Sequence, residues 1–214
     1  TSNSGANWVS QNSGITVSTI DDIFFIDQNT GWALTNDYLF QGTIVLRTTN
    51  GGASWTNYRL TDTTKVFNVI YFLNPLTGFL TGYTGEIFKT TNAGVNWTEC
   101  VIDTSFCSFF YLFPKNKISF LNSNTGYACG GQIDIVGMVW KTTDAGLNWL
   151  SYCVAPEPLY DIKPINPSKI AAIGGDPDYG VSFVVSYDGG VTWNYREIGI
   201  YGTGRSLAYR TVSE

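Results

Sequence analysis

Thr142 to Trp149 reads TTDAGLNW, and the same eight-residue phrase occurs four more times in the chain. The other copies are TSNSGANW from Thr1, TTNGGASW from Thr48, TTNAGVNW from Thr90 and SYDGGVTW from Ser186. Every copy fits the pattern Ser/Thr-x-Asp/Asn-x-Gly-x-x-Trp, which we call the box. Successive box tryptophans lie 47, 42, 52 and 44 residues apart. A period in the forties predicts a repeat architecture.

A second phrase lies between the boxes and keeps the same spacing. It reads FIDQNTGWAL from Phe25, FLNPLTGFLTG from Phe72 and FLNSNTGYACGG from Phe120, with a decayed copy, PINPSKIAAIGG, from Pro164. Each repeat therefore holds four short runs rich in Val, Ile, Phe, Tyr, Trp and Thr, separated by Asn and Gly turns, which indicates β-hairpins. No stretch has an apolar stripe at helical spacing, so we predict an all-β chain.

Four short antiparallel strands repeated at this period predict the blades of a β-propeller, in which each blade buries its faces against its neighbours. An aromatic content of 15% is what such inter-blade cores require. We expect residues 1–214 to form one propeller segment. The expected blades are 20–61, 65–102, 108–154 and 158–199, with partial blades at 1–15 and 203–214.

Both ends of the chain fall within a repeat. We therefore expect a partial arc of about four to five blades that belongs to a longer propeller and a larger polypeptide. The alternative is a complete small propeller that closes with an irregular last blade.

The box residues are predicted to have structural roles. The glycine suits a backbone position with positive φ, the Asn or Asp can accept hydrogen bonds from nearby backbone amides, and the Trp starts the outer strand over the turn. These structural residues are Asn3, Gly5, Trp8, Asn50, Gly52, Trp55, Asn92, Gly94, Trp97, Asp144, Gly146, Trp149, Asp188, Gly190 and Trp193.

The box resembles the Asp-box, or BNR repeat, of sialidase-type propellers. The combined pattern F-[LI]-[DN]-x-x-T-G followed by [KR]-T-T-[DN]-[AG]-G-x-[SN]-W is most similar to the repeats of the photosystem II stability/assembly factor family, and it covers essentially the whole chain. The resemblance implies a non-catalytic propeller that binds a protein partner, with arginines on one face implicated. The arginines here fall at different phases of the repeat, so the photosystem partner itself is not implied. They are Arg47, Arg59, Arg196, Arg205 and Arg210.

The amino-acid composition indicates what kind of surface the protein has and in which compartment it occurs. Charged residues make up 14% of the chain, against roughly 25% in ordinary soluble domains, so the surface must be rich in hydroxyl and amide groups. The net charge of −5 argues against nucleic-acid binding, because no basic stripe is present to neutralise phosphates. The chain contains no run of eighteen apolar residues, which is about the length that spans a bilayer. We expect an extracellular or periplasmic protein.

The four cysteines are Cys100, Cys107, Cys129 and Cys153. Two disulfides with three possible connectivities could form, and the pair Cys100–Cys107 is the easiest to imagine across one short loop. The alternatives are a metal site, which the lack of histidine and of any Cys-x-x-Cys pair disfavours, and cysteines that are simply small buried apolar residues.

The loops of one propeller face are the expected place for a ligand, and they include residues 35–42, 130–137 and 174–180. Tyrosines beside carboxylates in these loops suit a protein segment or a carbohydrate laid across the central depression. The predicted partner-binding residues are Asp37, Tyr38, Asp134, Asp178, Tyr179, Tyr201 and Arg205.

No catalytic, cofactor-binding or metal-binding residue is predicted. The absence of histidine removes Ser-His-Asp and Cys-His catalysis from this segment. The predicted function is a non-catalytic binding or assembly scaffold. The alternative is a sialidase-like or xyloglucanase-like glycoside hydrolase with catalytic residues partly outside the segment, which would show two carboxylates roughly 5 to 10 Å apart on this face.

Two local features have alternatives of their own. Asp176 and Asp178 could hold calcium, but a plain turn is favoured because two acids fall short of the six to eight oxygen ligands that calcium takes. An aromatic insertion after Cys107 could form a docking patch or could cover a blade edge or the channel. Its residues include Phe109, Phe110, Tyr111 and Phe113.

Overall fold

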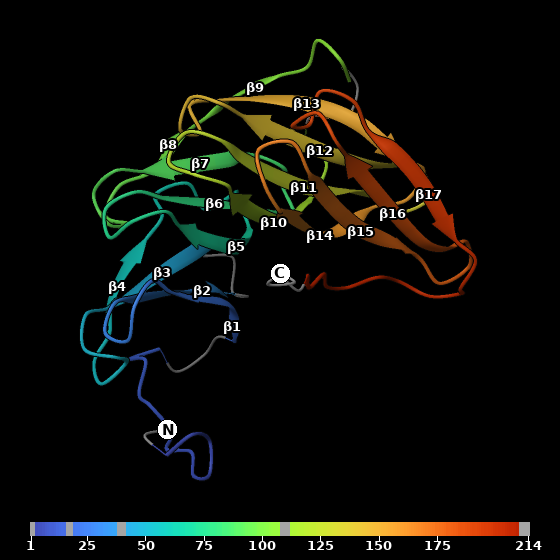
Figure 1. Ribbon diagram of the computed structural model, residues 1–214. Helices are drawn as coiled ribbons and strands as arrows, with labels where there is room; N and C mark the ends of the chain where they lie inside the picture. The colour runs from blue at the N-terminus through green and yellow to red at the C-terminus, as the bar shows by residue number, and fades with distance from the viewer. Residues whose placement is uncertain (1–2, 16–18, 38–41, 108–111, 210–214) are drawn as a thin grey trace.

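The computed structural model describes residues 3–15, 19–37, 42–107 and 112–209, and these ranges contain strands and turns but no helix. Four sheets fan out in an arc, with the strands β1, β5, β10 and β14 along its concave side (Figure 1). The described residues therefore include no helix that is long and apolar enough to cross a bilayer. The prediction of an all-β chain that forms a partial propeller is confirmed.

Each sheet is one blade, and its strands follow one another from the inside of the arc outward. Blade 1 consists of β1 (Ile20–Phe25), β2 (Gly31–Asp37), β3 (Gly42–Thr48) and β4 (Thr56–Arg59). Blade 2 consists of β5 (Phe67–Phe72), β6 (Gly78–Gly82), β7 (Ile87–Thr90) and β8 (Thr98–Glu99). Blade 3 consists of β10 (Lys115–Phe120), β11 (Gly126–Gln132), β12 (Val136–Thr142) and β13 (Asn148–Ala155), with β9 (Val101–Asp103) at its outer edge. Blade 4 consists of β14 (Leu159–Pro164), β15 (Ile170–Asp176), β16 (Gly180–Ser186) and β17 (Asn194–Ile198).

Blade 3 differs from the four-stranded antiparallel blade that the repeat predicts. After β8 the chain leaves blade 2 and runs along the outer edge of blade 3, where β9 pairs in parallel with β13. The hydroxyl of Ser151 donates to the carbonyl of Asp103 at 3.0 Å and adds to this pairing. The connection between blades 2 and 3 therefore also serves as a fifth strand, and β8 is only two residues long.

Every inner strand contains the same irregularity near its first residue. The register shifts by one residue at the start of β1, β5, β10 and β14, which is the signature of a β-bulge. The residues in the bulge position are Asp21, Asn68, Asn116 and Tyr160. A bulge re-aims a side chain, and Asn116 reaches the neighbouring inner strand, where its Nδ2 donates to the carbonyl of Leu159 at 2.9 Å. Asp21 instead accepts from Asn36 Nδ2 of its own blade at 3.0 Å.

The four complete boxes lie at the end of the blades that also carries the turns between the first and second strands. We call this end the lower end. In blade 3, the N–H of Ala145 in the box donates to the carbonyl of Asn124 in the turn at 2.9 Å, and blades 1, 2 and 4 have the equivalent bond. Gly146 has a φ of 80°, and the corresponding box glycines also have positive φ.

Hydrogen bonds within the box fix its conformation. Thr142 Oγ1 accepts the N–H of Gly146 at 3.0 Å and donates to Asp144 Oδ1 at 2.8 Å. The same Asp144 oxygen accepts the N–H groups of Leu147 and Asn148. Equivalent bonds are made by the Ser/Thr and Asp/Asn of the other boxes in blades 1, 2 and 4. The box from Thr1 keeps the bond from Asn7 N–H to Asn3 Oδ1, but its Trp8 is 80% exposed.

An aromatic side chain at the start of the second strand locks each blade to the box of the next. Trp32 Nε1 donates to the carbonyl of Ala93 at 3.0 Å, and Tyr127 donates through its hydroxyl to the carbonyl of Gly189 at 2.9 Å. Phe79 takes the same place between blades 2 and 3, where it leaves no room for a Cβ on Gly146. The equivalent residue of blade 4 is Ala171, which belongs to the divergent repeat PINPSKIAAIGG.

The single disulfide of the described residues joins Cys107 to Cys153, with Cα atoms 5.9 Å apart. Cys100 and Cys129 are free, so the expected Cys100–Cys107 pairing is wrong. The reason is β9, which extends the chain between those two residues. Its parallel pairing with β13 instead carries Cys107 alongside the far end of that strand, where Cys153 lies.

Lys115, the first residue of β10, is completely buried. Its ammonium group donates to the carbonyl of Gly85 and lies 3.9 Å from the centroid of the Trp140 ring. Burial lowers the pKa of Lys115 to about 7, and the negative charge of Glu86 opposes this shift.

We expect Thr142→Val to destabilise the protein by roughly 1 to 3 kcal/mol, because the buried N–H of Gly146 loses its acceptor while the shape of the side chain is kept. The exposed Thr56, which is the first residue of β4, provides the control, and Thr56→Val should change stability by less than about 0.5 kcal/mol. Urea unfolding measures both. Equal effects of the two substitutions would show that the box bond is unimportant.

Reduction of the Cys107–Cys153 disulfide, which closes a sequence separation of 46 residues, should lower stability by about 2 to 4 kcal/mol. Thermal unfolding with and without reductant checks this. The double variant Cys107→Ser/Cys153→Ser should melt like the reduced protein and should not respond to reductant. A wild-type melting temperature that is insensitive to reductant contradicts the prediction.

The lowered pKa of Lys115 predicts a pH dependence of stability. Between about pH 7 and the ordinary lysine pKa of 10.5, the unfolded chain binds more protons at this site than the folded chain. The free energy of unfolding should therefore rise with pH across this window. Lys115→Met should make the slope shallower, as urea unfolding at several pH values will measure. An unchanged slope in the variant would mean that Lys115 is not the group responsible.

Candidate functional site

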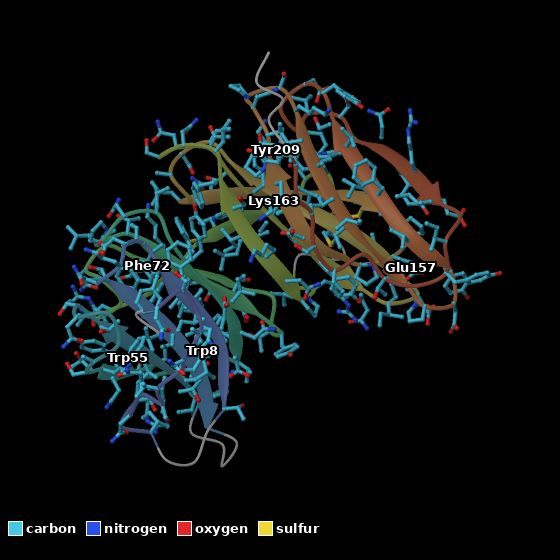
Figure 2. The ribbon with its side chains drawn as sticks, turned by 60° about the horizontal axis from the view of Figure 1, so that its bottom comes forward. Trp8, Trp55, Phe72, Glu157, Lys163 and Tyr209 are labelled. Atoms are coloured by element: carbon cyan, nitrogen blue, oxygen red, sulfur yellow. A yellow bond between two sulfur atoms is a disulfide. The ribbon has the colours of Figure 1, made fainter. Side chains whose placement is uncertain are left out.

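The end of the blades opposite the boxes, which we call the upper end, brings carboxylates from different blades together. Asp134 lies in the β11–β12 turn, Glu157 in the connection from β13 to β14, and Asp176 at the end of β15. The N–H of Asp134 donates to Glu157 Oε2 at 3.1 Å. Figure 2 shows Glu157 at the opposite end of the blade-4 strands from Lys163 and Tyr209.

Two of these carboxylates are buried. The exposed fraction is 5% for Glu157 and 7% for Asp176. Burial raises the pKa of Glu157, the hydrogen bond from Asp134 N–H lowers it, and the negative charges of Asp134 and Asp176 raise it further. In the described part of the chain the ion pairs are Lys65–Glu86 and Lys163–Asp161, so neither Glu157 nor Asp176 has a cation within 4.0 Å there.

The backbone around Glu157 is held closely by the two blades. Its carbonyl packs against Gly137 of β12 where a Cβ would clash, and Pro158 packs in the same way against Gly174 of β15. The N–H of Gly175 donates to the carbonyl of Pro158 at 2.9 Å. With a proline on each side as well, Glu157 has little freedom to move its backbone.

Arg205 lies over Tyr160, the bulge residue of β14. The guanidinium carbon is 4.2 Å from the centroid of the tyrosine ring, and Nε donates to Thr203 Oγ1 at 3.1 Å. The segment that carries Arg205 is held against blade 4 by the N–H of Leu207, which donates to Asp161 Oδ2 at 2.7 Å. Burial raises the pKa of Tyr160, and the charge of Arg205 opposes this.

A hollow of about 320 Å³ opens at the outer side of blade 4. Tyr179 and Tyr201, which are 64% and 87% exposed, stand beside it. Its lining residues are Asp178, Tyr179, Gly180, Glu197, Gly199, Ile200 and Tyr201.

The predicted partner-binding residues therefore do not form one cluster. Asp178, Tyr179 and Tyr201 share the hollow, Asp134 meets Glu157, and Arg205 meets Tyr160. Asp37 ends β2 in blade 1, and Tyr38 lies outside the described residues.

The partner-binding residues predicted from the sequence do not include Glu157, Asp176 or Glu197, which the structure places in the carboxylate group and beside the hollow. The only signal for Glu157 is its place between two prolines in a connection between blades, where an acid would be held rigidly.

Asp176 and Asp178 form a turn, in which the N–H of Asp178 donates to Asp176 Oδ1 at 2.8 Å. No group of three or more His, Cys, Asp or Glu side chains placed to hold a metal ion occurs among the residues that the structure describes. The geometry thus matches a hydrogen-bonded turn.

In the aromatic insertion after Cys107, Phe113 packs against the core between blades 2 and 3. Phe106, which precedes Cys107, is exposed and stacks on Tyr152 with ring centroids 5.7 Å apart. Phe109, Phe110 and Tyr111 lie outside the described residues.

One family of known proteins matches most of this sequence. The family described as photosynthesis system II assembly factor YCF48 matches residues 1–157. No curated protein sequence matches the chain.

Solved structures share the fold. The structure titled "YCF48 bound to D1 peptide" is 21% identical, with a TM-score of 0.58 over 85% of this chain and 56% of that one. YCF48 from Cyanidioschyzon merolae is 18% identical, with a TM-score of 0.56 over 86% of this chain and 58% of that one. The GH74 enzyme of Niastella koreensis is also 18% identical, with a TM-score of 0.56 over 80% of this chain and 28% of the enzyme.

The chain spans somewhat more than half the length of the two YCF48 structures. At these identities the structures establish the fold alone, whereas the family match extends over most of the sequence. The chain belongs to the family described as photosynthesis system II assembly factor YCF48.

Proposed function

We propose that this protein is a non-catalytic scaffold that binds a segment of a protein partner at the upper end of blades 3 and 4. The observation that carries the proposal is the hollow beside Tyr179 and Tyr201. Exposed tyrosines supply large contact areas at protein interfaces, and a concave surface lets a partner bury them. Ile200 adds an exposed apolar side chain to the same surface.

The family supports a protein partner, because one solved structure with this fold is titled as a complex with a D1 peptide. The identity of the partner does not transfer at 21% identity. A carbohydrate remains the alternative ligand for the same tyrosines, since sugars also stack on aromatic side chains.

An extracellular or periplasmic location is part of the proposal. It is supported by the Cys107–Cys153 disulfide, because disulfides form and persist in oxidising compartments. The low content of charged residues agrees with this setting.

A glycoside hydrolase is the second candidate. The GH74 enzymes share the fold at 18% and 12% identity. Buried Glu157 next to Asp176, with its raised pKa, has the property that a general acid requires. Release of reducing sugars from xyloglucan, abolished by Glu157→Gln, would establish this candidate and would remove the proposal of a non-catalytic protein.

Selection from a displayed library of random peptides tests the scaffold proposal. We expect the protein to enrich specific peptides, and Tyr179→Ala and Tyr201→Ala should each weaken their binding about tenfold, since tyrosines often dominate interface energetics. Tyr187, which is 62% exposed at the lower end, provides the matched control, and Tyr187→Ala should bind as the wild type does. Peptides that bind all three variants equally would place the binding surface elsewhere.

A further inference from the structure

We infer that the partner segment is cationic, and that one of its lysine or arginine side chains lies against Glu157 with Asp134 and Asp176 beside it. This inference rests on the proposed function and specifies the chemistry of the partner. Three observations carry it: the balance of charge at the upper end of blades 3 and 4, the state of the Glu157 carboxylate, and the apolar side chains around it.

The charge of this surface is one-sided. Five acidic residues belong to it, in the carboxylate cluster and around the hollow of blade 4, and they are Asp134, Glu157, Asp176, Asp178 and Glu197. Two described arginines are near these acids in the chain: Arg196, which precedes Glu197 in the exposed β17, and Arg205, whose guanidinium lies over Tyr160. Asp134 and Asp176 both act on Glu157 as negative charges. The surface therefore complements positive charge.

Glu157 is the buried group that points to a ligand. Its Oε2 accepts one hydrogen bond, from the N–H of Asp134, and no other hydrogen bond joins its side chain to the described residues. Its side chain is nevertheless more than nine-tenths buried. The other oxygen, Oε1, is not sealed from solvent, so a ligand can reach it. Partial desolvation of this carboxylate is not offset by an opposite charge within 4.0 Å in the described residues. A lysine or arginine from the partner would supply the absent charge.

The surroundings of Glu157 fit a long basic side chain. Ile133 and Ile135 flank Asp134 in the β11–β12 turn and are 45% and 52% exposed. The methylene stem of a lysine or arginine could lie along these two side chains while its charged end reaches the carboxylates. Because the backbone of Glu157 is fixed by the close packing at Gly137 and Gly174, little ordering would be lost on binding.

A bound metal ion is the other cationic occupant. Calcium takes six to eight oxygen ligands, whereas no cluster in the described ranges is placed to hold a metal ion. A basic side chain needs only one or two carboxylates, and Glu157 with Asp134 and Asp176 beside it meets this need.

The test uses two fluorescent synthetic peptides of the same length. One contains two lysines and an arginine around a tyrosine, and the other has glutamate in place of each basic residue. Fluorescence anisotropy measures their binding at low and high salt. We expect the cationic peptide to bind, salt to weaken its binding, and the acidic peptide to bind at least tenfold more weakly.

Two isosteric variants locate the binding. Glu157→Gln removes the central charge and keeps an oxygen that can accept the Asp134 N–H, so it should fold normally and bind the cationic peptide about tenfold or more weakly. Glu99→Gln removes the same charge from the exposed β8 and is the matched control, which should bind as the wild type does. Thermal unfolding of both variants confirms that they are folded.

The possible failures are distinguishable. Equal or tighter binding of the acidic peptide, or equal effects of Glu157→Gln and Glu99→Gln, overturns the cationic inference. If the peptide then still depends on Tyr179 and Tyr201, the scaffold proposal stands. A library selection that enriches no peptide, together with no binding of either synthetic peptide, overturns both.

Discussion

The contact on which the structure depends is the one between an aromatic side chain at the start of a second strand and the box of the following blade. A blade cannot bury its own two faces, so its position must be set by its neighbours. Trp32 fixes blade 2 through the carbonyl of Ala93, and Tyr127 fixes blade 4 through that of Gly189. The box can accept these bonds because its own hydrogen bonds hold its carbonyls in place. The phrase that repeats in the sequence is therefore also the joint between the repeats.

A second type of contact links neighbouring inner strands: an aspartate directly after the bulge residue accepts a backbone N–H from the next inner segment. Asp22 of β1 accepts the N–H of Ile70 in β5 at 2.9 Å, and Asp161, at the equivalent position of β14, accepts the N–H of Leu207 at 2.7 Å. Leu207 thus stands to blade 4 as Ile70 stands to blade 1. This relation places Arg205 at the position of a bulge residue, next to the bulge residue Tyr160, and explains why these two side chains meet at the upper end.

The repeats predicted the strands and their arrangement because each box and each Asn-Thr-Gly turn determines its neighbourhood locally. What the sequence did not predict depends on distant pairing. Strand β9 joins β13 some 47 residues further along the chain, and this pairing alone decides that Cys107 meets Cys153. Glu157 is similar, since its burial becomes apparent only when blades 3 and 4 are placed side by side. Local patterns in the sequence contain neither fact.

The two ends of the blades differ in how their polar side chains are used. At the lower end the Ser/Thr and Asp/Asn side chains of the boxes hold the turns through hydrogen bonds. At the upper end, close packing of the connections against blades 3 and 4 can hold a buried charged side chain in place. Glu157 is such a group: the glycines and prolines around it keep a carboxylate buried without a cation. A cationic partner of the kind that we propose would offset this uncompensated charge on binding.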